Sequence, residues 1–155
     1  MEHIVNQIHK SLIKNKKTLA VGESCSGGLL SHLLTSIAGS SGFFLLGVVA
    51  YSNAAKTKIL KVPPSVIIRY GVVSKRVAAY MAKNIRIIAG ADFGIGITGI
   101  AGPGGFTPGK PVGTVFIAAA SRKKVICRKF TFKGKRAYVQ RESALKSLQL
   151  LKELF

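Results

Sequence analysis

A strand that breaks into small residues and then becomes a helix is the feature that most constrains the fold of this chain. Residues 18–21 form a short apolar run, residues 22–28 read Gly-Glu-Ser-Cys-Ser-Gly-Gly, and an apolar helical pattern begins at Leu29. A strand-to-helix turn of small residues presents backbone N–H groups and hydroxyls at the end of a sheet, where open α/β folds place their chemistry. This segment therefore predicts a sheet-based fold and marks the place of a functional site.

The other segments alternate between helical and extended patterns. Residues 75–89 follow Ser74, a helix-capping residue type, and carry apolar side chains at helical spacing. Residues 43–51 are continuously apolar, which is typical of a buried strand. The short polar link at residues 121–124 predicts that the last two strands form a hairpin. Helices are expected over residues 4–13, 27–35, 53–59, from Pro64, 75–89 and 135–154, and strands over 18–21, 43–51, 93–98, 113–120 and 125–132.

Alternating elements followed by a hairpin predict an α/β fold, a three-layer α/β/α domain whose mixed sheet is covered by helices on both faces. The length of 155 residues fits one domain over residues 1–155. No apolar run reaches the roughly 18 to 20 residues of a membrane span, and the N-terminus lacks a signal-peptide pattern. Cys25 and Cys127 fit a reducing compartment and lack metal-binding spacing. We expect a soluble, cytoplasmic protein with no membrane partner, metal or cofactor.

The balance of charge is strongly basic, with 24 Lys and Arg residues against 5 Asp and Glu residues and a net charge of +19. Such a chain can bind nucleic acids, because its cations neutralise phosphates. Here the basic residues are spread along the chain, and no aromatic residues alternate with them as a base-stacking platform requires. We expect a solvated, lysine-rich surface that draws anionic substrates to a cleft, with nonspecific nucleic-acid binding as the alternative.

The glycine-rich loop resembles a phosphate-binding P-loop only in part. Gly104, Gly109 and Lys110 match its fixed positions, but Pro111 stands where a Ser or Thr must bind Mg²⁺, and a strand follows instead of a helix. These departures argue against an ATP-binding P-loop. Two interpretations stay open for this loop: anion binding by backbone N–H groups, and a tight connection that needs glycine.

A serine nucleophile in this chain would need an unusual base. His3, His9 and His32 do not fall in a pattern that places one of them beside a serine. A neutral lysine is the known substitute for histidine in serine activation.

Four ordered blocks of sequence resemble the CinA C-terminal domain family, the nicotinamide-nucleotide amidases, over nearly the whole chain. The first block reads Glu-Ser-Cys-Ser-Gly-Gly, where the family has E-S-C-T-G-G, and the third reads Tyr-Gly-Val-Val-Ser, where the family has H-G-A-V-S. The blocks cover residues 23–28, residues 38–41 with 47–53 and Lys56, residues 70–74, and residues 98–105 continuing to 110–115.

This resemblance implies an amidohydrolase that converts nicotinamide mononucleotide to nicotinate mononucleotide and ammonia without a metal. It implies that Ser24 is the nucleophile, that Lys56 is the base and that Tyr51 lies near this dyad. The alternatives are a family member that has lost catalysis and a basic nucleic-acid-binding protein. The resemblance also implies a nucleotide as substrate and a homo-oligomer as the assembly.

The chemistry requires a neutral Lys56, so its pKa must fall well below the ordinary value of about 10.4. Burial against residues 43–49 and repulsion by other cations would both lower it. Backbone N–H groups around residues 26–28 are expected to hold the oxyanion. Cys25 is a rival nucleophile, but a small buried role is favoured for it. The residues expected to bind substrate are Glu23, Ser26, Gly27, Gly28, Asn53, Thr98, Gly99, Gly102, Gly104, Gly105, Lys110 and Arg136.

Glu23 is expected to orient Lys56 or to bond the pyridine end or the ribose of the substrate, because acids are scarce here and perturbed groups cluster at sites. The alternative is an ordinary carboxylate that pairs with a surface lysine. Lys110 and Arg136 are expected to bind the phosphate together with the loop at residues 98–105. Two positions depart from the family pattern: Ala54 stands where a Glu is common in Y-S-N-E-A-K, and Lys135 stands for the Asp of G-D-R.

Overall fold

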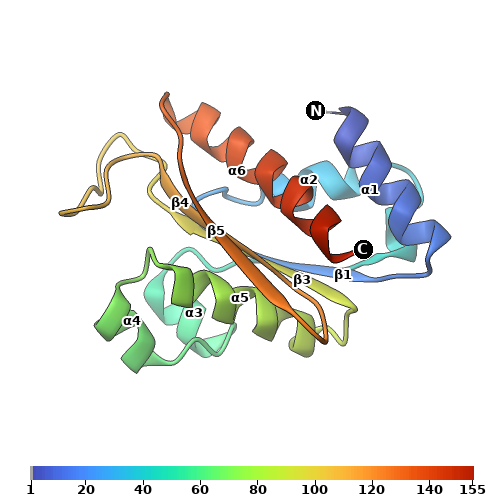
Figure 1. Cartoon of the computed structure of the whole chain (residues 1–155), viewed down its shortest axis with the longest axis horizontal. Coiled ribbons are helices and arrows are strands. Elements are labelled where there is room, and N and C mark those ends of the chain that lie inside the picture. The colour runs from blue at the N-terminus through green and yellow to red at the C-terminus, as the bar shows by residue number, and fades with distance from the viewer. Residues whose placement is uncertain (1) are drawn as a thin grey trace.

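A five-stranded mixed sheet, with strand order β2-β1-β3-β4-β5, forms the centre of the molecule, as the computed structural model describes it for residues 2–155 (Figure 1). β1 pairs in parallel with both β2 and β3, and β4 and β5 continue the sheet in antiparallel fashion. This arrangement confirms the predicted mixed sheet and the predicted hairpin. The strands are β1 (Leu19–Glu23), β2 (Phe44–Val49), β3 (Phe93–Gly99), β4 (Thr114–Ala120) and β5 (Val125–Thr131).

Helices cover both faces of this sheet, which gives the three predicted layers (Figure 1). One layer contains α1 (Glu2–Lys14), α2 (Leu29–Thr35) and α6 (Arg136–Leu151), and the other contains α3 (Asn53–Lys58), α4 (Pro64–Tyr70) and α5 (Lys75–Ile88). Short 3₁₀ turns occupy Ser40–Gly42 and Lys152–Leu154. Alternate residues of β1 enter opposite cores: Leu19 and Val21 pack with the first layer, and Ala20 packs with the second.

The contact between α5 and β3 shows how sequence sets the layer spacing. The Ser74 hydroxyl accepts a hydrogen bond from the Val77 N–H and caps α5, as its residue type predicts. A Cβ atom on Gly94 or Gly96 would collide with the α5 backbone at Ala82 or Ala78. These two glycines therefore let the helix lie directly against the strand.

Two sequence predictions need correction. The apolar run at residues 43–51 was expected to be a buried strand, but β2 lies at the edge of the sheet, where Leu45 and Val49 remain 47% and 48% exposed. An apolar run indicates a strand without saying which neighbours flank it. The helix expected from residue 27 begins at Leu29, because Gly27 and Gly28 adopt left-handed conformations with φ of 67° and 93°.

The carboxyl ends of the parallel strands β1 and β3 meet at one edge of the sheet. Residues 24–28 leave β1 there, and the loop after β3 projects from the body as a long arm before β4 begins (Figure 1). This is the edge where open α/β sheets bind ligands. In the described part of the chain, every helix is too short or too polar to cross a membrane.

Candidate active site

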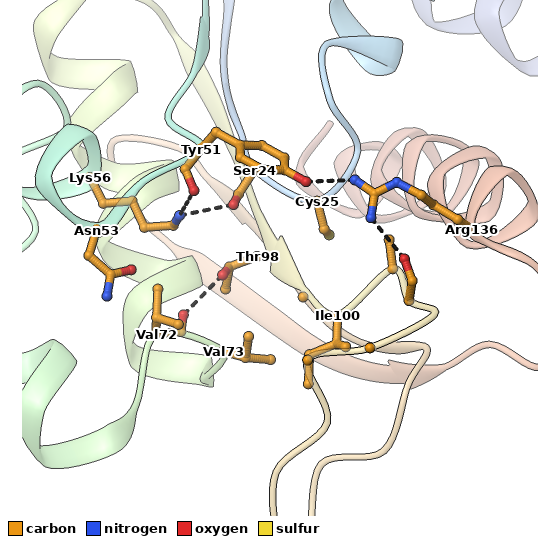
Figure 2. A pocket seen from close by; sticks show the side chains of 15 residues that line it. Ser24, Cys25, Tyr51, Asn53, Lys56, Val72, Val73, Thr98, Ile100 and Arg136 are labelled. Atoms are coloured by element: carbon orange, nitrogen blue, oxygen red, sulfur yellow. Dashed lines mark hydrogen bonds between the residues drawn. The ribbon is translucent and has the colours of Figure 1, made fainter.

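Ser24 and Lys56 meet at this edge of the sheet (Figure 2). Ser24 is the first residue after β1, and Lys56 projects from α3, which the Ser52 hydroxyl caps by accepting the Ala55 N–H. The distance from Lys56 Nζ to Ser24 Oγ is 2.9 Å. Lys56 is 2% exposed and Ser24 7% exposed, so the pair is buried although it borders a cleft.

Two backbone carbonyls complete the surroundings of the lysine nitrogen. Nζ lies 2.8 Å from the Ala50 oxygen and 3.4 Å from the Tyr51 oxygen. A neutral amine has two N–H donors and one lone pair. With both donors on these carbonyls, the lone pair is left for the hydroxyl proton of Ser24. The geometry therefore suits a neutral lysine that accepts a proton from serine.

Burial lowers the pKa of Lys56 below its ordinary value of 10.5. The physical cause is desolvation, because removal from water penalises the charged ammonium. Of the two expected causes, burial is therefore the one that acts. No carboxylate takes part in the three hydrogen bonds made by the Lys56 nitrogen, so none of these partners restores the charged form.

The cleft next to the dyad has a volume of about 290 Å³. Figure 2 shows Tyr51 lying over Ser24, with Val72, Val73 and Ile100 along the facing side. Ten of the residues expected in the site line this cleft: Ser24, Tyr51, Asn53, Lys56, Thr98, Gly99, Gly102, Gly104, Gly105 and Arg136. The lining set contains two cationic side chains and no carboxylate. Within residues 2–155, no three His, Cys, Asp or Glu side chains gather where they could hold a metal ion.

Arg136, in the first turn of α6, connects two walls of the cleft. Its Nη2 donates to the Tyr51 hydroxyl at 2.6 Å, and its Nη1 donates to the Gly102 carbonyl at 2.9 Å. Tyr51 itself is 59% exposed. The guanidinium therefore fixes the position of the tyrosine ring over the nucleophile.

Sequence reasoning missed the apolar wall. Val72, Val73, Ile100 and Ala101 line the cleft together with the thiol of Cys25. The Thr98 hydroxyl donates to the Val72 carbonyl at 2.9 Å and holds this wall against the end of β3. The signal was present, because these valines belong to the third block of the resemblance, but apolar side chains carry no chemical pattern of their own.

The Glu23 carboxylate lies away from both the cleft and Lys56. Its side chain is fully buried, outside the cleft lining, and its carboxylate caps α2. Oε2 accepts the N–H groups of Gly28 and Leu30 at 3.2 and 3.1 Å, and Oε1 accepts the Ser31 N–H and hydroxyl at 2.8 and 2.7 Å. The expected roles are therefore corrected: Glu23 contacts neither Lys56 nor a surface lysine and does not line the cleft, but ties the end of β1 to the start of α2.

The oxyanion donors expected around residues 26–28 also change. The Gly27 N–H donates to the Ser24 carbonyl at 3.0 Å, and the Gly28 N–H donates to Glu23. Neither glycine lines the cleft, and the Ser26 hydroxyl is buried without a partner among the described residues. Three N–H groups of this turn, those of Ser24, Cys25 and Ser26, have no acceptor within residues 2–155.

Lys110 lies outside the cleft as well. Its Nζ donates to the Tyr70 carbonyl at 3.2 Å. This contact ties the turn at residues 107–110 of the arm to the end of α4, just before the loop that carries Val72 and Val73. The expected phosphate contact of Lys110 is therefore replaced by a structural one in this conformation.

The thiol of Cys25 is a poor rival to Ser24. Burial raises its pKa to about 12. Because the thiolate is the reactive form of cysteine, this side chain stays protonated and unreactive near neutral pH. The geometry therefore favours the serine hydroxyl, which has a base within hydrogen-bond distance.

Comparisons with known proteins identify the family of this chain. The family model of the CinA C-terminal domain matches residues 1–155. A CinA-like protein from Desulfotalea psychrophila is 47% identical over 98% of this chain and 36% of its own length, and one from Anaeromyxobacter dehalogenans is 48% identical over 86% and 33%. The chain thus spans about a third of the length of these curated relatives.

Solved structures match over nearly their whole length. The competence/damage inducible protein CihA from Agrobacterium tumefaciens superposes with a TM-score of 0.96 at 33% identity, covering 99% of this chain and 94% of that one. A CinA superfamily protein from Escherichia coli gives 0.95 at 33% identity, covering 99% and 90%. The chain belongs to the CinA C-terminal domain family.

Proposed function

We propose that this protein is an amidohydrolase that converts nicotinamide mononucleotide to nicotinate mononucleotide and ammonia. The observation that carries the proposal is the 2.9 Å contact between Lys56 Nζ and Ser24 Oγ in a buried setting. A lysine with a lowered pKa beside a serine is the arrangement that activates a hydroxyl without histidine. The family resemblance supplies the substrate.

The reaction proceeds in two halves. Neutral Lys56 takes the hydroxyl proton while Ser24 Oγ attacks the carboxamide carbon and forms a tetrahedral oxyanion. When this intermediate collapses, the C–N bond breaks, Lys56 returns the proton to nitrogen and ammonia leaves. A nicotinoyl ester remains on Ser24. Water, deprotonated by Lys56, then attacks the ester and releases nicotinate mononucleotide.

The walls of the cleft suit the parts of this nucleotide. The ring packs against the apolar wall of Val72, Val73 and Ile100, opposite Tyr51. The phosphate lies toward Arg136 and the glycine-rich start of the arm. The absence of carboxylates from the lining set favours an anionic substrate, because no like charge opposes the phosphate there.

Ammonia release from nicotinamide mononucleotide tests the proposal. Wild type should produce ammonia, and Ser24→Ala and Lys56→Met should each lose about three orders of magnitude in kcat, as removal of a nucleophile or base does in related catalytic sets. Lys58→Met is the matched control, since it removes one exposed lysine from the same helix. Wild-type turnover no faster than Ser24→Ala would reject the proposal. Tight nucleotide binding by calorimetry without ammonia release would instead identify a member that has lost catalysis.

A further inference from the structure

We infer that Gln140 is a positioning residue that fixes the backbone after the nucleophile. This inference rests on the proposed role of Ser24. Gln140 Nε2 donates to the Cys25 carbonyl at 3.1 Å, across 115 residues of sequence. Its amide lies against the same turn from the side, because a Cβ atom on Gly27 would be 3.2 Å from Nε2.

The contact involves the peptide unit that can serve the oxyanion. The Cys25 carbonyl and the Ser26 N–H belong to one planar, trans peptide, so they point in opposite directions. When Gln140 holds the carbonyl toward α6, it also fixes the direction of the Ser26 N–H. That N–H, like those of Ser24 and Cys25, has no acceptor among the described residues.

Cys25 lines the cleft and directly follows Ser24 in sequence, so its backbone N–H belongs to the part of the turn that borders the site. Donors held in a fixed direction stabilise a developing oxyanion, because they need no reorganisation as charge appears. Gln140 therefore acts on the transition state through the backbone, without contact to the substrate.

Gln140 shares a helix face with Arg136. The two residues are four positions apart on α6, so they are neighbours on the helix surface. Arg136 holds Tyr51 and Gly102, and Gln140 holds Cys25. One face of α6 thus holds Tyr51, Gly102 and Cys25, which line three sides of the cleft, in fixed positions relative to one another.

Gln140→Met is the informative variant, because it keeps the length and most of the volume of the side chain but removes the donor. We expect kcat for nicotinamide mononucleotide to fall about tenfold or more, since small misplacements of catalytic groups carry large rate costs. KM should stay within about twofold of wild type, since an interaction realised only in the transition state lowers kcat. Gln149→Met, on an exposed part of the same helix, is the control and should leave both constants unchanged.

A second measurement is independent of the natural substrate. A fluorophosphonate probe reacts when Ser24 Oγ bonds to phosphorus, Lys56 takes the hydroxyl proton, and the P–F bond breaks to release fluoride. The rate of labelling at Ser24 should fall in Gln140→Met in parallel with kcat, while circular dichroism shows folded protein.

The outcomes separate the inference from the proposed function. If wild type fails to deamidate the nucleotide but labels at Ser24 in a Lys56-dependent way, the substrate is wrong and the labelling rate alone decides the role of Gln140. A labelling rate and kcat equal to those of Gln149→Met would overturn the inference. So would a rise in KM at constant kcat, which indicates a binding role. Absence of Ser24 labelling in wild type would remove both the dyad and its positioning residue.

Discussion

Replacing Glu23 tests the corrected role of this buried carboxylate. Glu23 is fully buried and accepts four hydrogen bonds from the start of α2. Glu23→Ala removes all four at once and leaves three backbone N–H groups and one hydroxyl without an acceptor. Glu23→Gln keeps the shape of the side chain, but its NH₂ group must face at least one of the N–H donors.

The size of the effect follows from these contacts. A buried donor that loses its partner costs about 1–3 kcal/mol. Because Glu23→Ala leaves four donors without a partner, we expect it to lose at least about 4 kcal/mol of unfolding free energy, and we expect Glu23→Gln to lose about 2 kcal/mol. Because domains of this size have about 5–15 kcal/mol in total, Glu23→Ala is close to the limit of folding. The glutamine variant should lower Tm by about 4–8 °C.

Equilibrium urea unfolding, followed by circular dichroism, measures these differences. Glu142→Gln is the control, because Glu142 has only a 3.8 Å pairing with Arg141, and its change should stay within about 0.5 kcal/mol. A Glu23→Gln protein as stable as this control would refute the capping role. If that variant kept its stability but showed a raised KM for the nucleotide, the original expectation of a substrate contact would be restored.

Four further predictions concern charge. The rate constant kcat/KM should rise with pH through the lowered pKa of Lys56, because only the neutral amine accepts a proton, and a profile without this acidic limb would contradict the mechanism. Because burial lowers the pKa of Lys56, the unfolded chain binds a proton at Lys56 as pH falls below 10.5 while the folded protein still resists it. Wild type should therefore lose stability as pH falls, and urea unfolding should show Lys56→Met becoming more stable relative to wild type at lower pH. Lys135→Asp should raise Tm by about 2–4 °C, because Lys135 occupies the N-cap of α6 without a side-chain hydrogen bond, and Lys133→Asp, with an equal charge change outside the helix, should not. Added salt should lower kcat/KM for nicotinamide mononucleotide, whose net charge is negative, because it screens the attraction to the +19 protein. It should raise kcat/KM for nicotinamide riboside, which lacks the phosphate and is a cation. Equal responses of the two compounds would exclude electrostatic steering by the protein charge.

Local sequence predicted the elements well, because each one carries its own signal. Ser74 marks the start of α5, and the polar link at residues 121–124 marks the β4–β5 hairpin. The pairing of Ser24 with Lys56 is different in kind. The two residues are 32 positions apart, and only the family resemblance brought them together before the structure gave their distance.

The wrong predictions concern the directions in which side chains and backbone N–H groups point, and the order of the strands. Glu23 was expected in the site because acids are scarce in this chain and it stands at the end of a strand, but its side chain points into the start of α2 and not into the cleft. No periodicity reveals that the Gly28 N–H points at a carboxylate, and none reveals that Val72 and Val73 line the cleft. The edge position of β2 was missed for a similar reason, because strand order depends on pairings between distant segments.

The edge strand β2 has a consequence for behaviour in concentrated solution. Residues 43–53 contain no charged side chain, so this edge lacks the lysines and prolines that usually discourage strand pairing between molecules. Repulsion between copies that each carry +19 can supply the missing protection at a distance. The range of that repulsion shrinks from about 8 Å at 0.15 M salt to about 3 Å at 1 M. We therefore expect self-association through β2 to increase with salt, the opposite of the response of an assembly held by ion pairs.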